Sequence, residues 1–245
     1  LSQTVSRFLT NDFSDTQMES WSLSNLDLSV VENIHIIGCG TAYLAGMVGK
    51  SCLESSLKLP VHLELASEFR YGNPFINSGT LVIAMTQSGE TADTLASVKM
   101  AKSLGAQVLA ICNVDFSSIV RESTASILME AGCEIGVAST KAFTAMILNL
   151  YLFKIKMAVR KDLLEASHLQ KITQELRSLD ALVHQCSALE EQLISIAKAY
   201  YSAHSFLFVG RGYSYPIALE GALKLKEISY IHAEGYAGGE LKHGP

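Results

Sequence analysis

A short turn rich in hydroxyl and amide side chains follows the apolar run of residues 80–85. Its residues are Thr86, Gln87, Ser88, Gly89, Glu90 and Thr91, and a helical pattern begins directly after them. Backbone N–H groups at a helix N-terminus lack intrahelical partners and carry partial positive charge, so they suit an anion. Gly89 also lets the backbone approach a ligand closely. The pattern predicts a phosphate-binding loop, and the alternative is an ordinary turn capped by Ser88 or Thr91.

A second turn, residues 38–41, has the sequence G-C-G-T and follows the β-branched run 33–37. Paired glycines after a strand also occur in dinucleotide-binding loops, but Tyr43 replaces the third glycine of that motif. We therefore expect Gly40 to admit a smaller ligand and Thr41 to donate a hydrogen bond to it. No cofactor is expected.

A third turn of small residues opens a long apolar helical pattern that begins at residue 140. It contains Val137, Ala138 and Ser139. In an open α/β sheet, the loops at the carboxyl ends of the strands converge on one crevice. We therefore expect this turn to face Thr41 and the 86–91 loop across a shared site. The alternative is that the hydroxyl side chains simply cap the helix.

Lys224 and Glu227 lie three positions apart in an otherwise apolar helical pattern, and Glu220 lies one turn earlier. This spacing places them on one helix face. A partly buried carboxylate beside a lysine suits a general base with a tunable pKa, and the alternative is a solvated ion pair. His243, in a glycine-flanked loop, is a candidate proton shuttle or else an incidental surface residue. The other histidines lack metal-ligand spacing, so no metal site is expected.

The bulk composition excludes several classes of protein. The 245 residues are 49% hydrophobic and 18% charged, with a formal net charge of −5. These values indicate a globular core and leave no basic surplus for nucleic acid. Five scattered cysteines indicate reduced thiols. The N-terminus does not resemble a signal peptide, and polar residues interrupt the apolar run 142–158. We therefore expect a cytoplasmic protein with no membrane or nucleic-acid partner.

Short apolar strands alternate with helices through the first 160 residues, as in a parallel α/β sheet covered on both faces. The expected strands are 33–37, 60–65, 80–85, 107–113 and 125–130. The expected helices are 41–54, 66–71, 92–101, a short one from 117, and 140–159.

The chain divides by composition into four parts. They are an N-terminal packing segment (1–28), a first domain (29–160), a helical connection (161–204) and the start of a second domain (205–245). The last part holds an expected strand, 205–209, and an expected helix, 216–230. Its G-R-G turn at 210–212 repeats the G-C-G turn at 38–40 with an offset of 172, which also relates Tyr43 to Tyr215 and Gly49 to Gly221. We expect a duplicated domain whose second copy is truncated.

Four longer runs carry a family resemblance. They are T-Q-S-G-E-T-A-D-T-L (86–95), E-I-G-V-A-S-T-K-A-F-T (134–144), L-E-G-A-L-K-L-K-E-I-S-Y-I-H-A-E (219–234) and G-G-E-L-K-H-G-P (238–245). Together they resemble the isomerase half of the glucosamine-6-phosphate synthases, which are glutamine–fructose-6-phosphate aminotransferases with two sugar isomerase (SIS) domains. The resemblance covers residues 30–245 and implies an SIS-type three-layer α/β/α fold with a parallel sheet.

The resemblance also implies a fructose 6-phosphate site. The family's phosphate loop falls on Thr86, Gln87, Ser88 and Thr91, and its sugar contacts fall on Gly40, Thr41, Val137, Ala138 and Ser139. The isomerase base falls on Glu227 and the assisting lysine on Lys224. His243 matches the ring-opening histidine, which in this family reaches in from the partner subunit of a dimer. The implied reaction converts fructose 6-phosphate and ammonia to glucosamine 6-phosphate in a homodimer.

This sequence also departs from the family pattern. Ala42 and Thr86 stand where the family often has serine, so Thr86 keeps a hydroxyl and Ala42 loses one. The family's glutaminase half and C-terminal lysine have no counterpart here, so we expect a fragment that is not competent alone. The alternatives are an SIS phosphosugar deglycase or deaminase, or a non-catalytic phosphosugar-sensing module. The joint presence of Lys224, Glu227 and His243 favours the synthase.

Overall fold

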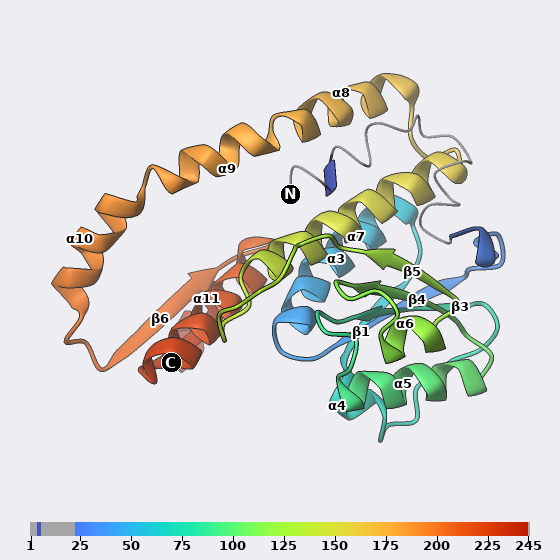
Figure 1. The fold of residues 1–245 in the computed structure, drawn as a ribbon, viewed down its shortest axis with the longest axis horizontal. Coiled ribbons are helices and arrows are strands. Elements are labelled where there is room, and N and C mark those ends of the chain that lie inside the picture. Colours follow the sequence, from blue (N-terminus) through green and yellow to red (C-terminus); the bar gives the residue numbers. More distant parts are fainter. Residues whose placement is uncertain (1–3, 6–22, 245) are drawn as a thin grey trace.

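The structure is a computed structural model that describes residues 4–5 and 23–244 (Figure 1). The strands are β1 (Asn33–Gly38), β2 (Val61–Leu65), β3 (Thr80–Met85), β4 (Gln107–Cys112), β5 (Ala125–Leu128), β6 (Ser205–Gly210) and β7 (His232–Ala237). The helices are α3 (Thr41–Leu57), α4 (Ala66–Phe69), α5 (Ala92–Ser103), α6 (Ser118–Glu122), α7 (Lys141–Arg160), α8 (Ala166–Arg177), α9 (Leu179–Ser187), α10 (Glu190–Tyr200) and α11 (Ser214–Ser229). The short 3-10 turns are η1 (Leu23–Asn25) and η2 (Leu241–His243). Most of the expected N-terminal packing segment lies outside the described residues.

The first five strands form one parallel sheet in the order β2-β1-β3-β4-β5. All six residues of β3 are buried, which matches the near-continuous apolar run that predicted this strand. The side chains of the sheet alternate between two buried clusters. One cluster lies under α3 and α7, and the other lies under α4, α5 and α6. The predicted three-layer α/β/α architecture is therefore confirmed.

Helix α3 packs closely on α7 because a glycine removes the side chain at the contact. A Cβ atom added to Gly49 would lie 2.3 Å from Cδ1 of Leu150. Helix α7 is long enough and apolar enough to cross a membrane. The polar residues that interrupt its apolar run predict instead that it does not. Since 72% of its most apolar window is buried inside the fold, packing as a core helix accounts for this composition.

Helices α8, α9 and α10 run in sequence from the end of α7 to the start of β6 and arch over one side of the molecule in Figure 1. Helix α8 buries only Ile172 and Leu176 against the rest of the chain, and α10 has no buried residue.

The last elements form a second, smaller unit in which β6 and β7 pair in parallel and α11 packs on both strands. Strand β7 was not expected, because its sequence H-A-E-G-Y-A lacks the apolar run that marks the buried strands. In contrast, β6 lies within one residue of its expected bounds.

The second unit repeats the first at the offset of 172. In the first unit Ile34 pairs with Val61, and in the second Phe206 pairs with Ala233, so the strand register is the same. The residues with positive φ repeat as well. Gly40 and Gly212 have φ of 52° and 56°, and the helix C-caps Lys58 and Tyr230 have φ of 55° and 60°. The predicted duplication is therefore present in the backbone geometry.

His35 is a buried histidine on the β1 face that packs against α4. Its ring lies 4.5 Å from the ring of His62 and 6.4 Å from that of Phe69, and its Nδ1 lies 3.7 Å from a carboxylate oxygen of Glu64. Burial, together with the charge of His62, lowers the pKa of His35 to about 4. Folded His35 is therefore neutral at pH 7.

This lowered pKa predicts acid sensitivity. The unfolded chain binds a proton at the ordinary pKa of 6.5, so stability is fully present above about pH 6.5 and is lost as the pH falls toward about 4. Between pH 7 and pH 5, we expect His35→Leu to lose about 2 kcal/mol less unfolding free energy than the wild type. Chemical denaturation at the two pH values measures this, with the exposed His168→Leu as control. Equal losses in His35→Leu and wild type would contradict the prediction.

Candidate functional site

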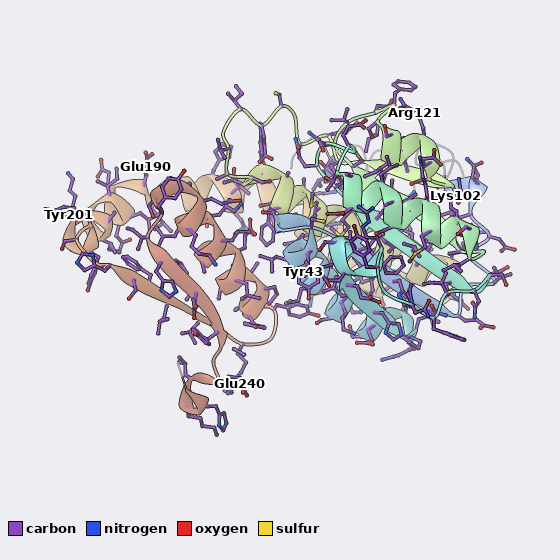
Figure 2. The ribbon with its side chains drawn as sticks, turned by 90° about the horizontal axis from the view of Figure 1, so that it is seen from below. Tyr43, Lys102, Arg121, Glu190, Tyr201 and Glu240 are labelled. Atoms are coloured by element: carbon purple, nitrogen blue, oxygen red, sulfur yellow. The ribbon has the colours of Figure 1, made fainter. Side chains whose placement is uncertain are left out.

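A cavity of about 180 Å³ lies at the carboxyl ends of β1 and β3, beside the start of α7. Loops at this end of a parallel sheet converge at the point where the strand order reverses. Six residues that the sequence predicts for the site line it: Thr41, Thr86, Gln87, Ser88, Thr91 and Ser139. Ala42 lines it too, so its methyl group stands where a serine would add a hydroxyl. Tyr43, the next residue, marks this region in Figure 2.

Hydrogen bonds within the 86–91 loop fix its conformation. The buried Thr86 hydroxyl accepts a hydrogen bond from the Gly89 amide at 3.1 Å, and the Ser88 hydroxyl accepts one from the Glu90 amide at 3.2 Å. Gly89 has φ of 72°, in the left-handed region, and a Cβ there would lie 2.0 Å from Oγ of Ser117. Glycine is therefore required on both conformational and steric grounds.

The N-terminus of α5 follows this loop and faces the cavity. Its N-cap residue, Thr91, makes no side-chain capping hydrogen bond. The acidic Asp93 in the first turn is paired with Arg70, whose Nη1 lies 2.7 Å from the carboxylate. Glu90 accepts a hydrogen bond from the Ser118 amide at 2.8 Å. Both acids near the helix start thus have partners of their own, and the uncapped amides suit an anion.

The loop before α7 contributes one of its three predicted contacts to the cavity. Ser139 lines the cavity, whereas Val137 is 96% exposed and Ala138 is not among the lining residues. Gly40 is the N-cap of α3 and directly precedes the lining residue Thr41.

Four side chains form a polar network between α3 and α11. The Thr41 hydroxyl donates to Oε1 of Glu220 at 3.0 Å and accepts from Nζ of Lys224 at 3.0 Å. Nζ of Lys224 also lies 2.5 Å from Oε2 of Glu227 and 3.5 Å from Oε1 of Glu220. The predicted pair Lys224–Glu227 is therefore joined to the cavity through a residue that lines it.

Glu220 also belongs to this network, although its sequence position alone did not predict it as a site residue. The residue is only 5% exposed, and its Oε2 atom is buried with no hydrogen-bond partner among the described residues. Burial raises the pKa of Glu220 against the opposing effects of Lys224 and Thr41. The sequence signal was its position four residues before Lys224 on an apolar helix.

The remaining predicted residue, His243, lies outside this cluster. It is exposed in η2, which projects from the body beside the Glu240 label in Figure 2. Within the described part of the chain, no group of three His, Cys, Asp or Glu side chains is arranged to hold a metal ion.

Comparison with known proteins identifies the family to which this chain belongs. A family model described as "SIS domain" matches residues 27–156 and 199–245. The glutamine–fructose-6-phosphate aminotransferase [isomerizing] of Escherichia coli K12 is 50% identical over 219 residues, which are 89% of this chain and 36% of that protein. The enzyme of the same name from Bacteroides thetaiotaomicron is 49% identical over 210 residues, 86% of this chain and 34% of that protein. The chain thus spans about a third of the length of these relatives.

Solved structures agree with this match. The C-terminal domain of glucosamine-fructose-6-phosphate aminotransferase from Francisella tularensis superposes with a TM-score of 0.93 at 42% identity, covering 99% of this chain and 69% of that one. A glucosamine-6-phosphate deaminase from Thermotoga maritima, at 19% identity and a TM-score of 0.71, covers 99% of this chain and 69% of that one, and it shares the fold.

The two left-handed glycines at the cavity predict different costs of substitution. Gly40 has φ of 52° and ψ of −125°, which residues other than glycine rarely adopt, with no atom within 4 Å of an added Cβ, so Gly40→Ala carries backbone strain alone, about 2 kcal/mol. Gly89→Ala adds the collision with Ser117, and we expect it to lower the unfolding free energy by at least about 3 kcal/mol. Urea denaturation measures both, and similar costs for the two variants would show that the collision is relieved by movement.

The Thr41–Glu220 hydrogen bond predicts energetic coupling between α3 and α11. In a double-mutant cycle on unfolding free energy, Thr41→Val and Glu220→Ala, which removes the acceptor, are expected to couple by about 1 kcal/mol. Thr173→Val on α8 serves as control, since its hydroxyl bonds to Leu169 within its own helix. That control should couple with Glu220→Ala by about zero. Additive effects of the Thr41 and Glu220 changes would contradict a direct link.

Proposed function

The chain belongs to the SIS-domain family, and from that premise we propose that it is the isomerase part of a glutamine–fructose-6-phosphate aminotransferase. In this proposal it binds fructose 6-phosphate and converts it with ammonia to glucosamine 6-phosphate. One observation carries the proposal. The cavity beside the 86–91 loop also contains Thr41, whose hydroxyl is bonded to both Glu220 and Lys224.

In this proposal the phosphate group is bound by the 86–91 loop. Thr86, Gln87, Ser88 and Thr91 line the cavity, and the uncapped N-terminus of α5 adds backbone amides. The cavity lining contains no lysine or arginine, so neutral donors and the helix dipole hold the anion. Gly40, Thr41, Val137, Ala138 and Ser139 are the proposed sugar contacts.

The proposed chemistry moves one proton within the sugar imine. Glu227 takes the proton from C1 and returns it to C2, while the C1 hydroxyl loses its proton and the imine nitrogen gains one, so that a ketose imine becomes a 2-amino aldose. Lys224, 2.5 Å from this carboxylate, donates a charge-assisted hydrogen bond to it before substrate arrives, and it remains close enough to stabilise charge on the sugar oxygens. Thr41 links this pair to the phosphate end of the cavity.

His243 is the proposed ring-opening residue and would act in the site of the partner subunit. Its exposure, away from the cavity of its own chain, supports this arrangement. We accordingly propose a homodimer, a glutaminase half in the full-length protein, and a cytoplasmic location. We also propose the domain division 1–28, 29–160, 161–204 and 205–245.

A non-catalytic phosphosugar sensor would need the phosphate loop alone. The bonded set of Thr41, Glu220, Lys224 and Glu227 is better explained by an enzyme, because burying a carboxylate is costly without a function or a partner for both oxygens.

The phosphate-binding proposal predicts that affinity depends on the phosphate group and on Ser88. Calorimetric titration of the chain with fructose 6-phosphate should give binding that unphosphorylated fructose does not. Ser88→Ala should weaken it about tenfold, since a hydrogen bond to a charged group is lost. Ser103→Ala, an exposed serine at the far end of the same helix, is the control. Equal binding of both sugars, or of wild type and Ser88→Ala, would contradict the proposal.

A further inference from the structure

Three helices begin at the proposed phosphate site. The first, α3, begins at Thr41, whose side chain is already bonded to Glu220 and Lys224, so the starts of α5 and α7 are compared. Helix α5 follows the 86–91 loop, and α7 follows the loop that holds Ser139. Both Thr91 and Ser139, at these two helix starts, line the same cavity. Each helix N-terminus offers unpaired amides and partial positive charge to an anion. The fold alone therefore gives a phosphate group two places to bind.

The N-terminus of α7 is already occupied by a carboxylate of the chain itself. Oε1 of Glu134 accepts hydrogen bonds from the amides of Thr140 at 2.8 Å and Ala142 at 3.2 Å. Its Oε2 accepts a hydrogen bond from the Ser139 hydroxyl at 3.0 Å. Glu134 thus makes the contacts that a bound phosphate would make at this helix.

Glu134 carries its negative charge at neutral pH. Burial pushes its pKa up, but the hydrogen bonds from Thr140, Ala142 and Ser139 outweigh burial, and the net pKa is lowered. The charge lies one hydrogen bond from the cavity wall, because Ser139 is part of that wall.

The N-terminus of α5 has no such internal anion. No side-chain acceptor bonds to the amides of residues 92–94 within the described part of the chain, and Asp93 is turned to Arg70. The starts of α5 and α7 therefore differ in one respect that matters for a phosphate. One is filled and negatively charged, and the other is open.

We propose that Glu134 is a specificity-determining residue that closes the N-terminus of α7 to anions and thereby restricts the sugar phosphate to the 86–91 loop. A single phosphate-binding position determines which end of the sugar points toward Thr41 and Lys224. The inference rests on the proposed function, since it assigns the orientation of the same ligand in the same cavity.

Two variants separate the charge of Glu134 from its hydrogen bonds. Glu134→Gln keeps a carbonyl acceptor for the α7 amides and removes the charge. Glu134→Ala removes both and opens the helix start. Glu54→Gln is the matched control, since it changes net charge equally, and 13 residues of helix separate Glu54 from Thr41, or about 20 Å.

The experiment is calorimetric titration of each protein with inorganic phosphate and with fructose 6-phosphate. We expect inorganic phosphate to bind about three- to tenfold more tightly to Glu134→Gln than to wild type, because a nearby negative charge is gone. Glu134→Ala should bind a second phosphate ion. In both variants the preference for fructose 6-phosphate over inorganic phosphate should fall at least about threefold, and Glu54→Gln should match the wild type.

A purely structural role for Glu134 gives the opposite result. Loss of a helix cap would weaken both ligands in Glu134→Ala and leave inorganic phosphate binding to Glu134→Gln at the wild-type value, and that pattern would overturn the proposal. If the wild type itself does not distinguish fructose 6-phosphate from fructose, the proposed function fails. If the wild type does so and the preference is unchanged in both variants, the specificity role alone fails.

Discussion

The hydroxyl of Thr41 connects the two repeated units of this chain. It donates to Glu220 and accepts from Lys224, so a single side chain on α3 holds two charged residues of α11 at 3.0 Å each. Lys224 in turn holds Glu227. Without this hydroxyl the buried Glu220 carboxylate would lose the one neutral donor that the described residues give it. The distance between the proposed anion-binding loop and the proposed acid–base residues is therefore set by the packing of α11 on α3.

The cavity separates two kinds of polar group. At the 86–91 loop, hydroxyls and backbone amides provide uncharged donors, and the nearby acids Glu90 and Asp93 are each bound by a partner. On α11, by contrast, the groups are a lysine and two carboxyl side chains in mutual contact. Neutral donors can bind a phosphate without trapping it, whereas proton transfer needs a carboxylate whose charge the surroundings can adjust. In the proposed function, each end of the site thus has the kind of polar group that its role requires: uncharged donors for the phosphate and carboxyl groups for proton transfer.

Sequence patterns predicted the parts of the molecule that depend on local physics. Strand β3 matches its predicted bounds, 80–85, because a sheet buried on both faces demands an apolar run there. Strand β7 was missed because its sequence H-A-E-G-Y-A has no apolar run, whereas its partner β6 in the same two-stranded sheet has one and was predicted.

The candidate site was likewise only partly predictable from the sequence. The hydroxyl residues of the 86–91 loop were found from their place after a strand. The roles of Glu134 and Glu220 could not be found in this way, since each depends on contacts that only the folded chain creates. Glu220 meets Thr41 from 179 positions away, and the contacts of Glu134 fix a loop conformation that its sequence does not specify.

The duplication explains why the proposed acid–base residues and the proposed phosphate loop come from different units. At the offset of 172, the positions of Glu220, Lys224 and Glu227 on α11 correspond to Val48, Cys52 and Ser55 on α3. Gly40 and Gly212 both keep a positive φ, of 52° and 56°, at the turn before each helix. The same helix face is therefore small or apolar in one unit and ionised in the other. Because α11 packs on α3, charges on both faces would have required further buried partners, and confining them to α11 leaves Thr41 as the one polar link that α3 must supply.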